Sequence, residues 1–381
     1  MRAYSLLGGS VSAKIETLWQ AEPHTIAKID MLRSYLYQWF TILGISSAFR
    51  GKDLWYIDGF AGPGEYTNYS EGSPVAALSA ARAAITSNPK WQAGDVRCLF
   101  IEEDNKRYQH LRRKLSEVAS HPKVHFDTFA GTFNDGVGHL KKQSVNPFTS
   151  ASPLFAFIDP FGPKGMSFAR VRELLSHGAC EVLINLDSDG VDRIYKAGAS
   201  ANHDIHLNDV FGDSEWESEM AGVPRKDIIG KVVALYKRKL RGLPDVRYAF
   251  SFEMRNQSSF DYHLVFATKH PRGLEKMKEV MKKFDQSGAY SFSDDHIGQD
   301  SLFNFNDPSI PAQHMKKYFL GKTVSYAQIV DYALNDSPYT NPKAMLKLLE
   351  KSNQIAVECA LPGRVLGTYP DKYAPVIKVR F

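Results

Sequence analysis

The stretch Leu54-Trp55-Tyr56-Ile57-Asp58-Gly59-Phe60-Ala61-Gly62-Pro63-Gly64 decides the fold of this chain. Its first four residues are apolar and two of them are aromatic, which predicts a strand buried on both faces. An aspartate and three glycines follow, and glycine lets a backbone turn sharply and come close to a ligand. Doubly wound α/β folds open their nucleotide site with a buried strand, an acidic residue and a glycine turn. We therefore expect this stretch to form such a site.

The glycine spacing departs from the GxGxxG of dinucleotide-binding folds, because Phe60, Ala61 and Pro63 stand where that motif has other residues. The stretch resembles motif I of class I S-adenosylmethionine (SAM) methyltransferases, a hydrophobic strand followed by D-x-F-A-G-x-G. This resemblance implies that the turn holds the methionine part of SAM. The residues expected to bind the cofactor here are Asp58, Gly59, Phe60, Ala61, Gly62 and Gly64. A glycine-rich loop without a ligand is the alternative.

Length and composition indicate a globular protein of more than one domain. The chain has 381 residues, of which 43% are hydrophobic and 23% charged. No apolar run reaches the ~18–20 residues that a membrane-spanning helix needs, and the N-terminus lacks the pattern of a signal peptide. The three cysteines are far apart and form no CxxC, so we expect no metal site and no disulfide framework. These observations predict a cytoplasmic protein without a membrane partner.

A second acidic residue follows the next predicted strand. Val96 to Ile101 is apolar and ends in Glu102-Glu103-Asp104. In nucleotide-binding folds the acidic residue at this point accepts hydrogen bonds from the ribose hydroxyls, and Glu102 is the first in line. Glu103 and Asp104 are expected to cap the helix that follows, because carboxylates suit a helix N-terminus. A capping role is also the alternative for Glu102.

The third strand, Lys123 to Asp127, leads into the loop that contacts the adenine ring in this kind of fold. Thr132 and Phe133 are our cofactor-binding candidates there, with Asp127 as a further one. Sequence does not choose among them, and a core position is the alternative for Phe133.

The fourth strand, Leu154 to Ile158, ends in Asp159-Pro160-Phe161-Gly162. This resembles the D/N-P-P-Y/F motif of methyltransferases that act on amino groups of bases, although the second proline is missing and Phe161 stands one place earlier. It is also similar to the form found in enzymes that methylate the guanine amino group of tRNA. The resemblance implies that Asp159 and Pro160 orient the acceptor nitrogen and that Phe161 stacks on the base. A tight turn with a capping aspartate is the alternative.

The remaining chain divides into segments by composition. Asn185, Asp187 and Arg193 follow the fifth strand, at the sheet edge where ligands bind. The segment Pro224 to Arg241 is an amphipathic helix with seven basic residues against one acidic, which indicates either nucleic-acid contact or a solvated face. We predict an N-terminal arm at 1–22, a methyltransferase-like domain at 23–284 with a helical insertion at 194–245, a linker at 285–320, and a winged helix-turn-helix domain at 321–381.

The whole pattern resembles one known family, the three-Cys-motif partner proteins (TcmP). The matching pieces are residues 35–40, 56–64, 72–74, 100–102, 158–162 and 264–270. The resemblance implies a Rossmann-like class I methyltransferase sheet and a small C-terminal winged helix. It also implies a partner that carries three cysteines and looks like a radical-SAM protein.

Two functions follow from these expectations. The first is a SAM-dependent methyltransferase that acts on an exocyclic amino group of a nucleic-acid base. The second is a non-catalytic adaptor that recruits the three-Cys partner to nucleic acid.

Overall fold

The computed structural model describes residues 17–162, 165–197, 201–255, 261–285, 290–294, 307–337, 339–340 and 342–381. Most of the predicted N-terminal arm therefore lies outside the described residues, as does much of the predicted linker. No helix in the described part of the chain is long and apolar enough to cross a membrane.

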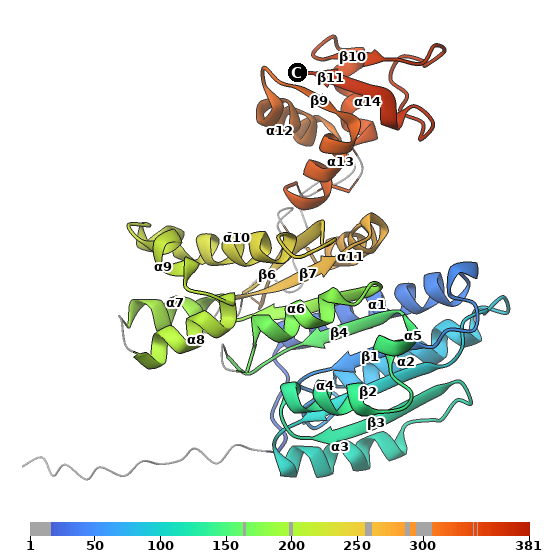
Figure 1. Ribbon diagram of the computed structural model, residues 1–381, viewed down its shortest axis with the longest axis vertical. Helices are drawn as coiled ribbons and strands as arrows, with labels where there is room; N and C mark the ends of the chain where they lie inside the picture. The colour runs from blue at the N-terminus through green and yellow to red at the C-terminus, as the bar shows by residue number, and fades with distance from the viewer. Residues whose placement is uncertain are drawn as a thin grey trace, which may run out of the picture.

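An eight-stranded sheet forms the centre of the molecule, in the order β3-β2-β1-β4-β5-β7-β6-β8 (Figure 1). The first five strands are parallel, and β7 runs antiparallel to both β5 and β6. This is the strand order of the class I methyltransferase fold, with β8 added at the edge. The strands are β1 Leu54–Asp58, β2 Val96–Glu102, β3 Val124–Ala130, β4 Leu154–Ile158, β5 Cys180–Leu186, β6 Tyr248–Arg255, β7 Asp261–Thr268 and β8 Ser291–Ser293.

Strand β1 lies between β2 and β4, where the strand order reverses. All five of its residues are buried, which confirms the two-sided burial predicted from its apolar run. Chains that leave β1 and β4 at their carboxyl ends turn to opposite faces of the sheet and leave a crevice between them. The glycine turn and the segment after Ile158 both begin at this crevice.

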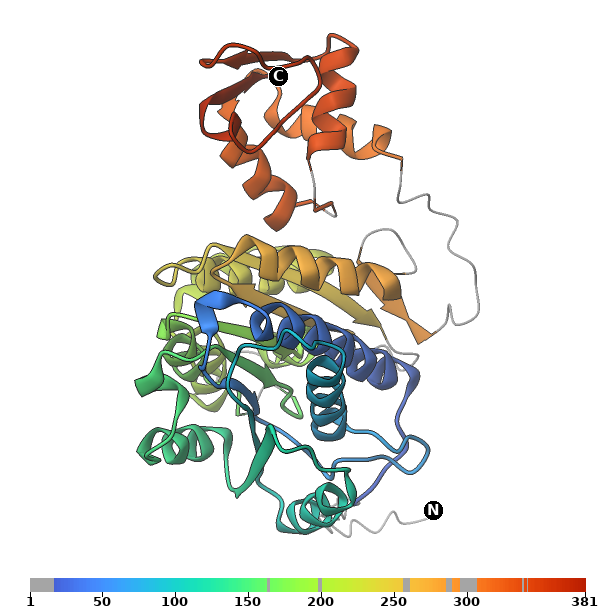
Figure 2. The same ribbon diagram turned by 90° about the vertical axis from the view of Figure 1, so that its right-hand side faces the viewer.

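Helices cover both faces of the sheet and build two hydrophobic cores. On one face α1 lies between α2 and α11, as Figure 2 shows, and α3 continues the layer. The bounds on this face are α1 Pro23–Gly44, α2 Ser73–Thr86, α3 Asn105–Glu117 and α11 Pro271–Phe284, with the short η1 Ser47–Phe49 after α1. The bounds on the other face are α4 Phe133–Lys142, α5 Pro147–Ser150, α6 Phe168–Ser176, α7 Ser188–Lys196, α8 Ala201–Phe211, α9 Glu215–Met220, η2 Arg225–Asp227 and α10 Ile228–Arg241.

The predicted helical insertion at 194–245 includes a helix that belongs to the basic fold. The apolar side of α10, with Val232, Tyr236 and Leu240, packs in the same core as β4 and β5, so α10 is the helix that connects β5 to β6. Four of its five basic residues pair with acidic ones: Lys231 with Glu219, Arg238 with Glu215 and Glu219, Lys239 with Asp213, and Arg241 with Asp336. These ion pairs engage much of the positive charge of α10, and its contact with nucleic acid stays a prediction.

The C-terminal unit combines helices with a three-stranded antiparallel sheet in the order β10-β11-β9. Its first helix, α12, begins at Ser309 and packs Ala312, Met315 and Phe319 into this unit's own core. The unit therefore begins near residue 309, and the predicted boundary at 321 is too late. The elements are α12 Ser309–Phe319, β9 Thr323–Ser325, α13 Tyr326–Asn335, α14 Lys343–Lys351, β10 Ala356–Cys359, η4 Ala374–Val376 and β11 Ile377–Arg380.

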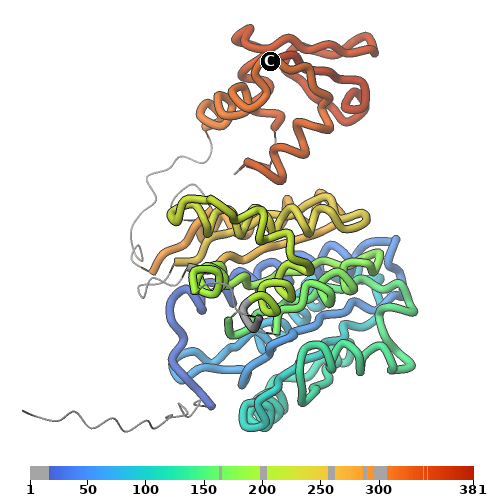
Figure 3. The backbone as a smooth tube through the Cα atoms, turned by 60° about the vertical axis from the view of Figure 1, so that its left-hand side comes forward, coloured from blue at the N-terminus to red at the C-terminus, as the bar shows by residue number. Residues whose placement is uncertain are grey.

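The C-terminal unit lies beside β6 and α11, and the backbone tube of Figure 3 shows it next to this end of the sheet. Two buried polar side chains join it to the main sheet. Asn335 accepts a hydrogen bond from the backbone N–H of Ala249 (3.0 Å) and donates one to the carbonyl of Arg247 (3.1 Å), so it pairs with the edge of β6. Lys278 of α11 donates to the carbonyl oxygens of Ala333 (2.9 Å), Leu334 (3.0 Å) and Ser337 (2.6 Å) at the end of α13. Both contacts satisfy backbone groups that burial would otherwise leave unpaired.

Candidate active site at the carboxyl ends of the strands

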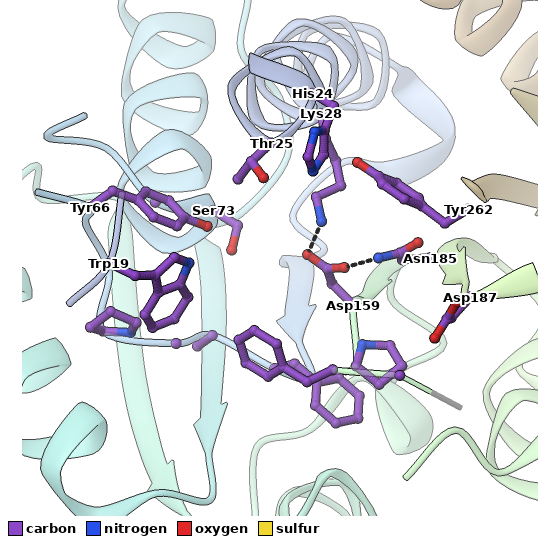
Figure 4. A pocket seen from close by; sticks show the side chains of 18 of the residues that line it. Trp19, His24, Thr25, Lys28, Tyr66, Ser73, Asp159, Asn185, Asp187 and Tyr262 are labelled. Atoms are coloured by element: carbon purple, nitrogen blue, oxygen red, sulfur yellow. Dashed lines mark hydrogen bonds and ion pairs between the residues drawn. The ribbon is translucent and has the colours of Figure 1, made fainter. Parts of the chain in front are cut away.

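A pocket of about 460 Å³ opens at the carboxyl ends of β1, β4 and β5 (Figure 4). It brings together two motifs that lie about a hundred residues apart in the chain, the glycine turn and Asp159-Pro160-Phe161-Gly162. Its wall is completed by Trp19 and the first turns of α1, the loop residue Tyr66, the start of α2 at 72–73, and Asn185, Asp187, Arg193 and Tyr262.

The glycine turn forms one wall of the pocket, and two of its residues have backbone conformations that favour glycine. Gly62 and Gly64 have φ values of +61° and +86°. A Cβ at Gly62 would meet no atom within 4 Å, so the space in front of this residue is open pocket. Gly72 lies against the turn and donates its N–H to the carbonyl of Gly64 (2.7 Å). The turn is thus held beside the N-terminus of α2, where amide groups favour an anionic ligand.

Asp58 lies beneath this wall and is fully buried. One oxygen accepts a hydrogen bond from the N–H of Phe60 (3.3 Å), the other from the hydroxyl of Tyr56 (3.4 Å), and Ser73 is also bonded to this carboxyl. Burial raises the pKa of Asp58 to about 7, against the lowering effect of these hydrogen bonds. In the structure Asp58 supports the turn through these hydrogen bonds, and its contact with the cofactor stays a prediction.

The raised pKa of Asp58 predicts a pH-dependent stability. In the unfolded chain the pKa of Asp58 is ~3.9, so the folded state favours the protonated acid. The contribution of Asp58 to the free energy of unfolding is therefore full below pH ~4 and is lost as the pH rises through about 7. Asp58→Asn removes this titration. We expect the free energy of unfolding of Asp58→Asn to rise by ~3 kcal/mol relative to wild type between pH 5 and pH 8, measured by urea unfolding. A difference that stays constant with pH would contradict the raised pKa.

Glu102 also supports the turn. Its Oε2 accepts a hydrogen bond from the N–H of Gly62 (2.9 Å) and its Oε1 one from the N–H of Asp104 (2.7 Å). Glu102 is buried, which raises its pKa, and it does not line the pocket. The cap of α3 is Asp104, as predicted. The contact of Glu102 with a ribose stays a prediction.

Of the three adenine candidates, Asp127 lies in β3 and outside the pocket lining, and the other two occupy structural positions. Thr132 is the N-cap of α4, where its hydroxyl accepts a hydrogen bond from the N–H of Asp135. Phe133 is buried beneath Gly59 and its ring lies 5.7 Å from the ring of Phe60, between centroids. Neither residue lines the pocket. Phe133 therefore takes the core position that the sequence left as its alternative.

Trp19 closes the outer side of the pocket, although its segment has no pattern that predicts a role. Its ring contacts those of Tyr66 and Phe161 edge to face, each at 5.6 Å between centroids. The guanidinium of Arg107 lies 5.5 Å from the ring of Trp19 and 5.0 Å from that of Phe161. The carbonyl of Trp19 accepts the N–H of Thr67 (3.0 Å), which ties this segment to the loop after the glycine turn.

Asp159 lies at the centre of the pocket and is already paired on both oxygens. Oδ2 accepts a hydrogen bond from Nζ of Lys28 (2.6 Å), and Oδ1 accepts one from Nδ2 of Asn185 (2.5 Å). The Lys28 side chain is only 9% exposed, so this ion pair is largely shielded from water. Pro160 lines the pocket beside it, and Phe161 lies at the rim with 65% of its surface exposed. The sequence indicated Asn185 but gave Lys28 no role.

The side of the pocket near β7 contains polar groups that the sequence did not single out. His24 pairs with Asp294 (2.8 Å), and its ring lies against that of Tyr262. The buried hydroxyl of Tyr262 has no hydrogen-bond partner among the described residues. These residues come from α1, β7 and the segment after β8, so no sequence spacing could have grouped them. Across the described ranges, no cluster of three or more His, Cys, Asp or Glu side chains could hold a metal ion.

Comparison with known proteins gives weak likenesses. No family model matches this sequence, and no curated protein matches it. An O-methyltransferase from Bacillus cereus, solved in complex with SAH, is 14% identical with a TM-score of 0.34, over 62% of this chain and 80% of that one. The O-methyltransferase TomG from Streptomyces achromogenes, solved with SAM, is 14% identical with a TM-score of 0.34, over 62% and 79%. Trm1 from Pyrococcus horikoshii, solved with SAM, is 11% identical with a TM-score of 0.35, over 72% and 63%. This chain has a class I methyltransferase fold by its own strand order.

Proposed function

We propose that this protein is a SAM-dependent methyltransferase that acts on an exocyclic amino group of a nucleic-acid base. The observation that carries the proposal is the shared pocket of the glycine turn and the Asp159-Pro160-Phe161 segment at the switch point of the sheet. A cofactor held at the first segment would present its reactive group to an acceptor held at the second.

The residues of the first segment fit SAM. Gly62 leaves open space where a side chain would stand, the start of α2 lies beside the turn, and Trp19, Phe60 and Tyr66 supply apolar and aromatic surface. Bound SAM supplies an electrophilic methyl group on a sulfonium. Gly62 and Gly64 would hold its methionine part, and Phe60 and Trp19 would cover it.

The protein itself must orient the two reactants and exclude water from the pocket. A neutral amine attacks the methyl group with its own lone pair, and its proton leaves afterwards, so acid–base catalysis is a minor requirement. Lys28, Asp159 and Asn185 form a hydrogen-bonded row in the floor of the pocket, and Trp19 shields it from the outer side. Phe161, at the rim, offers an exposed aromatic face on which an unstacked base can stack.

A transfer assay tests this proposal. Purified protein is incubated with methyl-labelled SAM and with single-stranded RNA or DNA, and the products are digested to nucleosides and analysed by mass spectrometry. We expect label on an amino nitrogen of one base, and at least a hundredfold loss of label in Phe161→Ala. Label that enters protein alone, or none at all in the presence of bound SAM, would refute the proposal.

The position of Trp19 makes it a reporter for SAM. The chain has five tryptophans, all within the described residues, and Trp19 alone lines this pocket. We expect SAM to change the tryptophan emission of the wild type, because a ligand beside the indole alters its packing against Tyr66. Trp19→Phe should lose most of that change while still binding SAM. A change of equal size in Trp19→Phe would show that SAM binds elsewhere.

One observation favours the second candidate, a non-catalytic adaptor. Asp159, the group expected to hold the acceptor, is already engaged by Lys28 and Asn185. In this second proposal the C-terminal unit is a winged helix-turn-helix module that contacts nucleic acid, and the partner is a three-Cys-motif radical-SAM-like protein. SAM binding without methyl transfer, together with co-purification of that partner, would support the adaptor. Loss of the partner from a chain that ends at residue 306 would assign its contact to the C-terminal unit.

A further inference from the structure

We infer that Asn185, and not Asp159, accepts the hydrogen bond from the amino group of the methyl acceptor. This inference rests on the proposed function and names the group that selects its substrate. Asp159 and Lys28 then act as positioning residues, which orient the amide of Asn185 without touching the acceptor.

The first step is that both oxygens of Asp159 are already engaged. Each of its oxygens already accepts a short hydrogen bond, one from the Lys28 ammonium and one from the Asn185 amide. Each oxygen keeps a second lone pair, so an amine could still contact Asp159, but to take the place of the charged donor it would have to displace Lys28. That would leave a buried ammonium unpaired, which is more costly than losing a neutral hydrogen bond.

The second step is the direction of the Asn185 amide. A carboxylate only accepts hydrogen bonds, so the NH2 of Asn185 must face Asp159 and its carbonyl oxygen must face away. That oxygen, Oδ1, is buried and has no hydrogen-bond partner among the described residues. Figure 4 shows it on the side of Asp159 opposite to Lys28, toward Asp187 and Tyr262, which also line the pocket. A buried acceptor without a partner is costly, and a donor from the ligand would satisfy it.

The third step concerns the substrate. A carbonyl oxygen fixed in this direction binds an N–H and repels a keto oxygen, because both oxygens carry only lone pairs toward each other. A site built around such a buried group rejects an analogue that cannot pair with it. The pocket should therefore prefer cytosine to uracil and adenine to hypoxanthine, pairs that differ by amino against keto. Asn185 would hold one N–H and leave the nitrogen lone pair free for the methyl group.

Binding of homopolymeric RNA tests this inference. The probes are fluorescently labelled 12-nucleotide oligomers of C, U, A and inosine, measured by anisotropy with S-adenosylhomocysteine present. The wild type should bind C over U, and A over inosine, at least tenfold more tightly. Asn185→Leu should reduce both ratios to within twofold while its affinity for SAM stays unchanged. Asn185→Ala is expected to give the same result and replaces the leucine variant if that does not fold.

A separate measurement tests the positioning role of Lys28. Lys28→Met should reduce the amino-over-keto ratios, and Lys28→Arg, which keeps a cation on Asp159, should restore most of them. A general structural defect would weaken all four oligomers alike and leave the ratios intact.

Two outcomes would overturn the inference in distinguishable ways. Tenfold ratios that survive in Asn185→Leu would show that another group, such as Asp159, contacts the amine, and the proposed function would stand. Failure of the wild type to bind any of the oligomers, with SAM affinity intact, would refute the nucleic-acid substrate and the inference together.

Discussion

Gly62→Arg is expected to weaken the binding of SAM by at least a hundredfold, as measured by calorimetric titration. Gly62 lines the pocket, and a side chain built there meets open space. The arginine would therefore extend into the volume that the cofactor needs and add a positive charge to the site of a cationic ligand. The N–H of Gly62, which donates to Glu102, is kept in the variant.

Gly51→Arg is the matched control, because it differs only in location. Gly51 has a φ of +70°, close to the +61° of Gly62, and a Cβ there also meets no atom within 4 Å. Each variant bears the cost of a left-handed non-glycine residue, ~1–2 kcal/mol. Gly51 is exposed before β1 and lies outside the pocket. Equal SAM affinity in the two variants would mean that the glycine turn does not hold the cofactor.

Lys278→Met should detach the C-terminal unit or lower its free energy of unfolding by ~3 kcal/mol, since each unpaired buried polar group costs ~1–3 kcal/mol. Lys278 is completely buried, and its ammonium serves the last carbonyl groups of α13. Methionine has a similar length and fills the space, so packing is largely preserved while these carbonyl groups lose their donor. Urea unfolding would measure the loss of stability, and limited proteolysis would show faster cleavage in α13.

Lys276→Met on the same helix controls for the loss of a lysine. Lys276 pairs with the exposed Glu279 (2.6 Å), an ion pair worth less than ~1 kcal/mol. We expect its proteolysis pattern to match the wild type. If both variants behave alike, the two units are held together by the apolar contacts of Leu334 and Val330 and not by Lys278.

Much of the fold could be predicted because its signals are local. The apolar runs that form β1, β2, β4 and β5 lie in the chain where the structure has those strands. The resemblance of the glycine turn to motif I implied that these strands belong to one class I methyltransferase sheet, and the observed strand order confirms this. Helix α10 shows the limit, since the acidic residues that balance its charge lie in and before α9 and could not be assigned to it from spacing alone.

The candidate site also has a part that the sequence predicted and a part that it did not. The residue types at the ends of β1 and β4 identified the glycine turn and Asp159 as one region, because parallel strands bring their carboxyl ends to one edge. The sequence also singled out Glu102 and Phe133, which the structure places behind the pocket wall. Strand-end position alone does not tell whether a side chain points into a crevice or beneath it.

By itself the sequence determined which segments are buried, where the backbone must turn, and that a nucleotide-type crevice opens after β1, because each depends on neighbouring residues. The tertiary structure decided the chemistry inside that crevice. Lys28, Asp159 and Asn185 come from α1, the end of β4 and β5, and they meet only because the first turns of α1 lie beside the strand ends. The protonation and hydrogen bonds of such groups depend on burial and on partners brought from far along the chain. Those two quantities arise from packing, and no local pattern contains them.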